Sequence, residues 1–428
     1  MPTDEPEALY SSQWIYPQGS NLKSLVGPLV ARVESSIASG SLSSRKPRSD
    51  GIKARRIAAE SITANIAHMV CSPDYIEGQR LIVSTAKTAK TRYHRPQYPQ
   101  NQIGLVVDQM ETHGFIIKHD YEFQKRSTTI EPTSKLKAAI SRHNIQPLDV
   151  GRYDGEETIW LYARNPERQA YGINSPKILV SYEDTRRTAQ YRKQMNIINR
   201  FLNTACITFN AQPLTPFALR RVFLLRSSTD APKFHLGGRL GGGIWMNLPS
   251  GERWKLAING EPLADLDFTG MFIQLAYLKA GLELPEDDPY IIEGLEAYRS
   301  GIKQALLVLL SRSGPMRLLK ADLKELLPNG WTYRDVVAIL EKRHPAIAHM
   351  FGSDRGIDLM FTESQMLVAL LVRLAELGIP ALPLHDGLMV RQSHKEATIQ
   401  AMYEVSKQQV GASLPVKEKP IAGMMCAG

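Results

Sequence analysis

Apolar residues in the first third of the chain recur with helical spacing, and this pattern predicts three helices. Residues 24–38 and 52–70 predict the first two, and the second places Ile62, Ile66 and Met69 on one face. A third amphipathic segment, NQIGLVVDQMETHG, ends at Gly114, a residue type that readily adopts the backbone conformation of a helix C-terminus. These helices are expected to pack on one another through their apolar faces.

Two short β-prone runs follow the third helix. They flank a charged turn and precede another helix in the segment FIIKHDYEFQKRSTTIEPTSKLKAAI. This order of helix, strand, turn and strand resembles winged-helix domains, in which the helix enters a DNA groove and the wing contacts the backbone. The resemblance implies that Lys125 and Arg126 contact phosphates. A wing that contacts no DNA is the alternative that the pattern leaves open.

Two basic segments are further candidates for contact with phosphates. In the loop KTAKTRYHRPQYPQ, cations alternate with Tyr93, His94 and Tyr98, which suits phosphate contact and base stacking. The predicted helix 183–202 has an apolar face and carries its Arg and Lys residues elsewhere. A solvated surface is the alternative for both segments.

Two apolar strands are predicted in the C-terminal half, and each of them delivers an acidic residue. The run 263–268 holds Asp265 and Asp267, and the segment IPALPLHDGLMV holds Asp386 before Gly387, which permits a tight turn. A buried carboxylate is costly unless it is paired or binds a metal. Two carboxylates on neighbouring strands suit a pair of Mg²⁺ ions, with Mn²⁺ as a substitute, and phosphoryl transfer. For Asp267 alone, capping of the next helix is the alternative.

A further helix is predicted between these strands by the segment YRSGIKQALLVLLSRSG. It places Arg299 and Lys303 on one face, opposite a nearly continuous apolar surface. A planar guanidinium and a compact ammonium group together suit the β- and γ-phosphates of a nucleotide. A solvated Arg/Lys face is the common alternative. The position of this helix between two acidic strands favours phosphate binding.

The ordered set of motifs resembles the polymerase core of DNA polymerase family A. The resemblance covers residues 233–428, a little under half of the chain. The template-primer segment of that family is similar to FHLGGRLGGGIWMNLP. This similarity implies duplex contacts for Arg239 and Asn247, with Arg253 as a weaker candidate.

Three further motifs bear the catalytic roles that this resemblance implies. Motif A is similar to ADLDFTGMFIQL, so that Asp267 is the implied first metal ligand and the backbone carbonyl of Phe268 completes the shell. Motif B resembles RSGIKQALL, which implies that its Arg and Lys bind the phosphates of the incoming nucleotide. Motif C is similar to LHDGLMV, which implies His385 near the primer end and Asp386 as the second metal ligand.

The chain departs from the family pattern at several positions. Gly387 stands where the DNA polymerases place a Glu, and motif B has Leu307 and Ser311 instead of its aromatic residues. The changes in motif B affect base stacking and translocation. Phe272 stands where the family's side chain packs against the sugar, so a deoxynucleotide preference is expected. The single-subunit phage-type RNA polymerases share this core and are the closest alternative.

Composition indicates a basic protein with an anionic partner. The 428 residues include 52 Lys and Arg against 43 Asp and Glu, and the net charge of +9 favours nucleic acid. A basic housekeeping enzyme is an equally good interpretation of the charge alone. Three widely separated cysteines show neither zinc-site spacing nor a disulfide framework, which indicates a reducing, cytoplasmic compartment. The acidic, polar start and the lack of a long apolar run predict a protein that is neither secreted nor membrane-spanning.

Together these patterns predict an α+β fold, a right-hand polymerase with an antiparallel palm sheet and helical fingers after a helical, winged-helix-like region. The expected domains are 1–148 for DNA binding, 149–232 as a connecting or thumb-like region, and 233–428 as palm and fingers. The expected partners are primer-template nucleic acid, preferably DNA, and nucleoside triphosphates. Replication of a plasmid, phage or other mobile element, without proofreading, is the expected role. An RNA polymerase or primase-like enzyme, and a non-catalytic DNA-binding replication protein with a decayed core, remain alternatives.

Overall fold

The computed structural model of this chain describes residues 6, 8–39, 49–73, 75–85, 90–122, 127–163, 177–214, 216–285, 287–384 and 386–421. The chain forms two compact units, one of Met1–Glu157 with Ile207–Phe217 and one of Thr158–Cys206 with Ala218–Gly428. Residues 149–232 contribute to both units. The fold is mixed α+β, as predicted, and most of its strand pairs are antiparallel.

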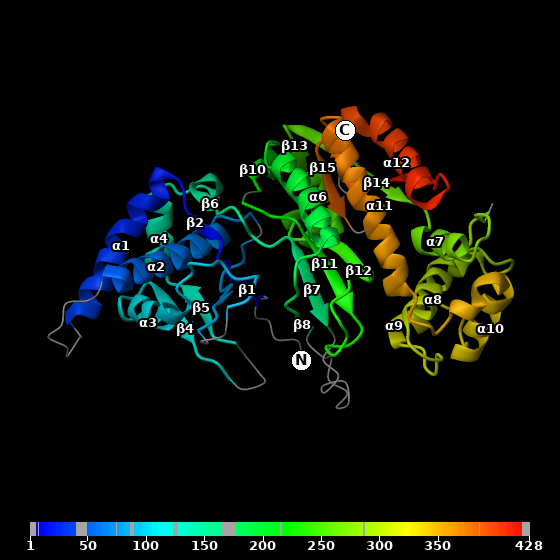
Figure 1. The fold of residues 1–428 in the computed structure, drawn as a ribbon, viewed down its shortest axis with the longest axis horizontal. Helices are drawn as coiled ribbons and strands as arrows, with labels where there is room; N and C mark the ends of the chain where they lie inside the picture. The colour runs from blue at the N-terminus through cyan, green and yellow to red at the C-terminus, as the bar shows by residue number, and fades with distance from the viewer. Residues whose placement is uncertain are drawn as a thin grey trace. The chain divides into compact units, whose positions relative to one another are not determined.

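Four α-helices in the described part of the first unit form its core (Figure 1). They are α1 (Ser20–Ser39), α2 (Ser49–Val70), α3 (Ile103–Thr112) and α4 (Ser134–Arg142). Their apolar faces meet in one core, which includes Ile62, Ile66 and Met69. The three helices predicted in this region are confirmed, because helical spacing places these side chains on one buried face.

A small sheet in the first unit has the strand order β1-β3-β5-β4. Its strands are β1 (Leu9–Tyr10), β3 (Leu81–Ile82), β5 (Thr129–Pro132) and β4 (Ile116–His119). Only β1 and β3 are parallel within it. Helix α3 leads into β4 through Gly114, whose φ of 67° ends the helix as predicted. The predicted order of helix, strand, turn and strand is therefore present in α3, β4 and β5.

Two short antiparallel pairs complete the described strands of the first unit. They are β2 (Ile15–Pro17) with β6 (Val150–Arg152), and β9 (Ile207–Phe209) with β10 (Gln212–Pro213).

A mixed sheet in the second unit has the order β12-β11-β7-β8. Its strands are β12 (Gly237–Gly241), β11 (Arg220–Leu225), β7 (Ile159–Ala163) and β8 (Ile178–Leu179). Helices α6 (Arg186–Leu202) and α11 (Gly356–Glu376) pack against this sheet and against each other. The exposed side of α6 carries four cations, Arg186, Arg187, Lys193 and Arg200.

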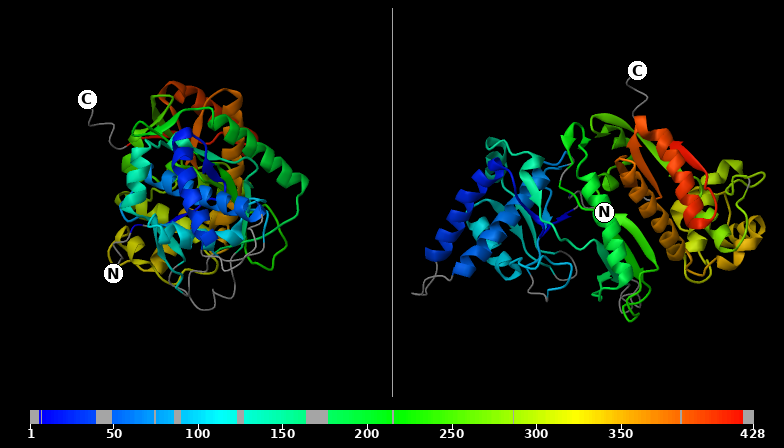
Figure 2. Two further views of the ribbon diagram at one scale, coloured as in Figure 1. Left: turned by 90° about the vertical axis from the view of Figure 1, so that its left-hand side faces the viewer. Right: turned by 45° about the horizontal axis from the view of Figure 1, so that its top comes forward.

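An antiparallel sheet carries the acidic residues of the predicted motifs, and we call it the carboxylate sheet. Its strands are β13 (Leu256–Ile258), β14 (Glu261–Phe268), β15 (Ala381–Leu384), β16 (Gly387–Arg391) and β17 (Val416–Lys419). The central strand is β14, with β16 on one edge and both β13 and β17 on the other. Helices α11 and α12 (Lys395–Val410) pack beside this sheet, as the orange and red ribbons in Figure 2 show.

A group of helices lies between β14 and α11 in the chain. They are α7 (Met271–Lys279), α8 (Arg299–Ser311), α9 (Ala321–Glu325) and α10 (Tyr333–Arg343), and Figure 1 shows them clustered together. The buried His344 joins them, because its ring nitrogens lie 2.9 Å from the hydroxyl of Tyr277 and 2.9 Å from the carbonyl of Pro289. Burial lowers the pKa of His344 to about 4, so its ring is neutral at pH 7.

Short 3₁₀ helices connect these elements. They are η1 (Gln100–Gln102), η2 (Pro147–Asp149), η3 (Ile244–Asn247), η4 (Ser250–Lys255), η5 (Glu296–Tyr298), η6 (Pro345–Met350) and η7 (Gln392–His394). Within the described ranges, no helix combines the length and the apolar character that crossing a bilayer requires.

Candidate active site

The strand register of the carboxylate sheet brings the two predicted metal ligands together. In the β14–β16 pair, Asp267 lies opposite Gly387, so Asp386, which precedes Gly387, lies beside Asp267. Asp265 lies on the same face of β14, because side chains two residues apart in a strand point to the same side. The strands that present the two acids are therefore neighbours, as the sequence predicts.

Burial makes this cluster of carboxylates electrostatically unfavourable. Asp267 is 5% exposed and Asp265 is 6% exposed. Burial, and after it the charge of Asp386, raises the pKa of Asp267 to about 6. Burial also raises the pKa of Asp265, although the nearby Lys419 opposes this rise. Carboxylates with raised pKa values that gather in one place are typical of functional sites.

Lys419 is the counter-cation of Asp267. Strand β17 pairs with β14, and the Nζ atom of Lys419 lies 2.6 Å from Oδ2 of Asp267. The other oxygen, Oδ1, is buried and receives no hydrogen bond from a described residue. A buried oxygen without a donor costs free energy unless another group satisfies it. Oδ1 of Asp267 is therefore suited to bind a cation.

The donor set fits a hard divalent cation. Mg²⁺ commonly binds through one or two carboxylates and completes its shell with water and phosphate oxygens. Asp267 and Asp386 supply these carboxylates. The described residues contain no cluster of three or more His, Cys, Asp or Glu side chains that could hold a metal ion by themselves.

Gly387 has a second structural reason beside the tight turn that the sequence predicts. It is the first residue of β16 and pairs with Leu384, the last residue of β15, so the tight turn is present as predicted, although Gly387 does not have a positive φ. A Cβ atom at this position would lie 2.4 Å from the backbone oxygen of Leu266 and 3.0 Å from Oδ1 of Asp267. The close approach of β14 thus requires glycine and excludes the Glu that the family A enzymes place here.

Arg239 is held by a buried glutamate of α11. Its Nε and Nη2 atoms donate to the two carboxylate oxygens of Glu363 at 2.7 and 2.9 Å, and Glu363 is 0% exposed. Burial raises the pKa of Glu363, and the ion pair with Arg239 opposes this rise. The guanidinium of Arg239 also lies 5.6 Å from the ring centre of Phe272. The predicted duplex ligand and the predicted sugar-contacting ring therefore form one cluster with Glu363.

The two cations of α8 lie over the ring of the same buried tyrosine. Arg299 is 5.4 Å and Lys303 is 5.7 Å from the ring centre of Tyr290. Arg299 also forms an ion pair with Asp288, in which Nη2 lies 2.6 Å from Oδ2. Burial raises the pKa of Tyr290 far above its usual range, and nearby carboxylates, including the two predicted metal ligands, add to the rise. Tyr290 is thus an electrostatic neighbour of both the α8 cations and the acid pair.

The other predicted residues occupy separate positions. Asn247 is exposed at the end of η3. Arg253 lies in η4, where its charge lowers the pKa of Asp265 against the effect of burial. Phe268 ends β14 with its side chain buried. Outside the described residues lie Lys125, Arg126 and His385.

Three residues of this site were not predicted from the sequence. Glu363 had a usable signal, because it lies four residues from both Leu359 and Leu367 on the apolar face of α11, where a charge needs a partner. Lys419 lies in the short segment VKEK, which is too short to identify as a strand with confidence. Tyr290 lies in a loop, where no periodicity indicates burial.

No protein-family model matches this chain, and no curated protein matches its sequence.

Proposed function

We propose that this chain is a template-directed nucleotidyltransferase of the DNA polymerase family A type. The observation that supports it most is the placement of Asp267 and Asp386 on adjacent strand ends, with both acids and Arg299 of α8 within electrostatic reach of the same residue, Tyr290. In this proposal the carboxylate sheet is the palm of a right-hand polymerase, and helices α7 to α10 are its fingers. The first unit, with its order of helix, strand, turn and strand, would bind DNA during replication of a mobile element.

Different side chains of the second unit would have different roles in nucleotide addition. Asp267 and Asp386 would hold Mg²⁺, which would lower the pKa of the primer 3′-hydroxyl and neutralise the triphosphate. Arg299 and Lys303 would bind the β- and γ-phosphates, and the ion pair with Asp288 would orient the guanidinium of Arg299. The 3′-oxygen would attack the α-phosphate while the bond to the bridging oxygen breaks and pyrophosphate leaves.

The choice between deoxynucleotides and ribonucleotides would rest on Phe272. This half-buried ring near the start of α7 is restrained by the guanidinium of Arg239, so its bulk would exclude a 2′-hydroxyl. We expect Phe272→Ala to raise ribonucleotide use relative to deoxynucleotide use by about tenfold or more, since the loss of a steric clash of about 1.4 kcal/mol suffices. Phe272→Tyr keeps the ring and is the matched control. An unchanged ratio in Phe272→Ala would contradict the role of this side chain.

A non-catalytic DNA-binding replication protein is the second candidate, and one observation favours it. Lys419 already neutralises Asp267, so the carboxylate has a partner without any metal. In a protein without activity, this ion pair would serve only to stabilise the β14–β17 contact. The missing aromatic residues of α8 are compatible with the same interpretation.

Primer extension with Mg²⁺ separates these candidates. The variants are Asp267→Asn, Asp386→Asn and Asp322→Asn, and Asp322 is an exposed acid on α9 that serves as the matched control. Extension by the wild type and by Asp322→Asn, but not by the other two, supports the polymerase. An inactive wild type that still binds DNA supports the second candidate. Parallel reactions with ribonucleotides, and without a primer, test the RNA polymerase and primase-like alternatives.

A further inference from the structure

A pocket in the first unit is lined in part by Tyr98 and Gln100, two residues of the basic and aromatic loop. It has a volume of about 550 Å³, which is within the usual range for a site that takes a small molecule or a single nucleotide base. It is formed by β1 and the residues after it, by β3 and the residues after it, by Ser127 and Thr128 before β5, and by residues of α2, η1 and α3.

Among the described residues that line this pocket, most are polar and none is charged. Its apolar part is made by Ile62, Ile82, Val83 and Ile103. The other lining residues bear hydroxyl or amide groups, and they are Tyr10, Ser11, Gln13, Ser84, Thr85, Tyr98, Gln100, Tyr121, Ser127 and Thr128. A phosphate group inside the pocket would find no cation among these described residues. The lining therefore suits a neutral ligand with one apolar face and polar edges.

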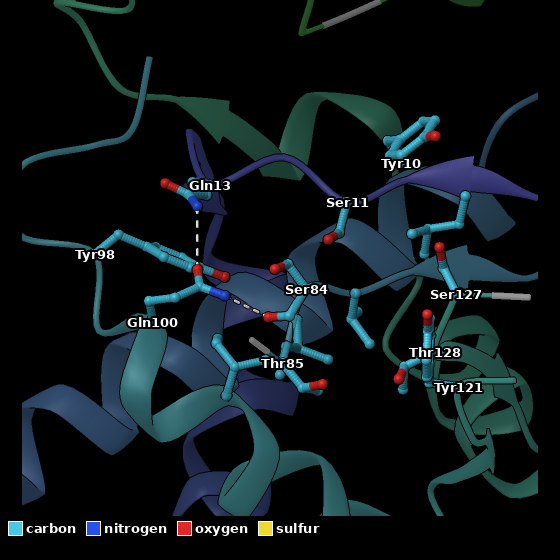
Figure 3. A pocket seen from close by; sticks show the side chains of 14 residues that line it. Tyr10, Ser11, Gln13, Ser84, Thr85, Tyr98, Gln100, Tyr121, Ser127 and Thr128 are labelled. Atoms are coloured by element: carbon cyan, nitrogen blue, oxygen red, sulfur yellow. Dashed lines mark hydrogen bonds between the residues drawn. The ribbon is translucent and has the colours of Figure 1, made fainter. Parts of the chain in front are cut away.

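The amide groups on one side of the pocket are fixed by a chain of hydrogen bonds. Gln13 Nε2 donates to Oε1 of Gln100 at 3.2 Å, and the backbone N–H of Arg95 donates to Oε1 of Gln13 at 3.2 Å. Gln100 Nε2 in turn donates to the backbone oxygen of Ser84. Figure 3 shows Gln13 and Gln100 on this side of the pocket. This wall is therefore organised before any ligand binds.

The opposite side of the pocket presents aromatic rings and uncommitted hydroxyl groups. Figure 3 shows Tyr10 and Tyr121 there, and these tyrosines are 82% and 60% exposed. Large exposed rings beside a pocket are suited to stacking on a flat ligand. Several lining hydroxyls, those of Ser11, Ser84, Thr85, Ser127 and Thr128, make no side-chain hydrogen bond to another described residue. They are free to satisfy the polar edges of a ligand.

We propose that this pocket binds an unpaired base of single-stranded nucleic acid while the phosphates of that strand remain outside. A base has the apolar faces that the aliphatic wall and the tyrosines can contact, and it has the polar edges that the free hydroxyls can satisfy. Because each hydroxyl can donate or accept, the pocket would accept any of the four bases. The inference rests on nucleic acid being the partner of the chain, as in the proposed function.

The test compares two oligonucleotides that differ only in their bases. Binding of the full chain to a short labelled oligothymidylate is measured by fluorescence anisotropy, beside an abasic strand of equal length with the same phosphates. We expect the strand with bases to bind about tenfold more tightly, as base stacking on aromatic side chains typically gives. Raising the salt concentration should weaken both complexes but leave their ratio nearly unchanged, since only phosphate contacts release counterions.

Variants locate the base-dependent part of the affinity. Tyr10→Ala should lower the ratio between the two strands, whereas Tyr10→Phe should keep it because the ring remains. Ser84→Trp, at an exposed position, should fill the pocket and bring the ratio close to one. Ser141→Trp, at an exposed position of α4 away from the pocket, is the matched control and should leave the ratio as in the wild type.

The outcomes separate the pocket from the polymerase. Equal affinities for the two strands would contradict the proposal that the pocket binds a base. An affinity ratio that Ser84→Trp leaves unchanged would contradict it as well. Free thymidine that binds the pocket while the two strands bind equally would also overturn it, in favour of a small-molecule site. Primer extension by the same wild-type preparation tests the proposed function separately. A wild type that is inactive in primer extension but binds the strand with bases more tightly would contradict only the proposed polymerase function. An active wild type that binds the two strands equally would contradict only the base-binding role of the pocket.

Discussion

The two units of this protein differ in how several of their ionisable side chains are balanced. In the first unit, the partly buried Arg55 and Arg92 each form an ion pair with one acid, Glu34 and Glu157 respectively. In the second unit, the buried Asp265 and Asp267 both lie within electrostatic reach of Asp386 and Lys419, and burial raises the pKa of Asp267. Matched pairs serve stability, whereas an excess of buried like charge is costly and persists where a ligand uses it. The contrast therefore supports the proposal that the functional site lies in the second unit.

The sharpest way to test this contrast is to neutralise the acids of the second unit. We expect Asp267→Asn and Asp386→Asn each to lower the rate of nucleotide addition about a thousandfold or more, because loss of a metal ligand removes several kcal/mol of transition-state stabilisation. Thermal unfolding without metal should show little loss of stability, since each substitution also relieves repulsion between carboxylates. Single-turnover extension and thermal melts measure the two effects. Variants that lose thermal stability, and lose activity only in proportion to the fraction that is unfolded, would show that these acids have a structural role.

The next test compares two bidentate ion pairs of similar geometry, one in each unit. Arg239→Ala would leave Glu363 fully buried without a partner, and a cost of about 3–5 kcal/mol is expected. Arg55→Ala leaves Glu34, which is 21% exposed and can reach water, so a smaller cost of about 2 kcal/mol is expected. Urea unfolding followed by circular dichroism measures both. Equal losses in the free energy of unfolding would contradict the expectation that the deeper burial of Glu363 makes the loss of its partner more costly.

The pH dependence of stability gives a third test, in the absence of divalent metal. The pKa of Asp267 is raised from 3.8 to about 6, so the native state binds this proton more tightly than the unfolded chain does. Its contribution is fully present below about pH 4 and is lost as the pH rises through 6, an effect of about 3 kcal/mol. The free energy of unfolding of the wild type should therefore fall relative to that of Asp267→Asn between these pH values. A constant difference would mean that Asp267 titrates normally.

The smallest expected effect comes from two glycines with opposite surroundings. Gly387→Ala places a Cβ atom against β14 and beside Asp267, so we expect a loss of about 1–3 kcal/mol from forced strand movement. Gly104→Ala, in α3, meets no atom within 4 Å, so a gain of about 0.5–1 kcal/mol is expected from the better helix former. Denaturant midpoints compare the two variants. A neutral Gly387→Ala would mean that β14 and β16 can separate at no cost.

Local pattern was sufficient to locate the elements that carry the site. The apolar run around Asp267 and the run before Asp386 are both strands, and the segment with Arg299 and Lys303 is helix α8. These predictions succeeded because apolar periodicity reports which face of a strand or helix is buried. The tight turn at Gly387 was predicted as well, but the close approach of β14 to the same glycine could not be predicted from local pattern.

The partners of the acidic and basic residues could not be read from local pattern. Glu363 meets Arg239, and Lys419 meets Asp267, although each pair is far apart in the chain. The partners of the cations in the basic and aromatic loop, KTAKTRYHRPQYPQ, could not be predicted from local pattern either. Within the described residues, Arg92 pairs with Glu157, and Arg95 is buried beside the rings of Tyr98 and Tyr153. Charges that suggest phosphate contact in the sequence are thus engaged inside the first unit.

The sequence by itself determined the α+β class, the order of the elements and the two acids around which the proposed function is built. These properties depend on residue type and spacing, which act over a few residues. Only the tertiary structure decided which charge faces which, because that depends on strand register and on helices packed across the sheet. It also decided that Phe272 is restrained by Arg239, that Oδ1 of Asp267 lacks a donor, and that a neutral pocket exists in the first unit. Long-range packing sets these contacts, and no local pattern encodes them.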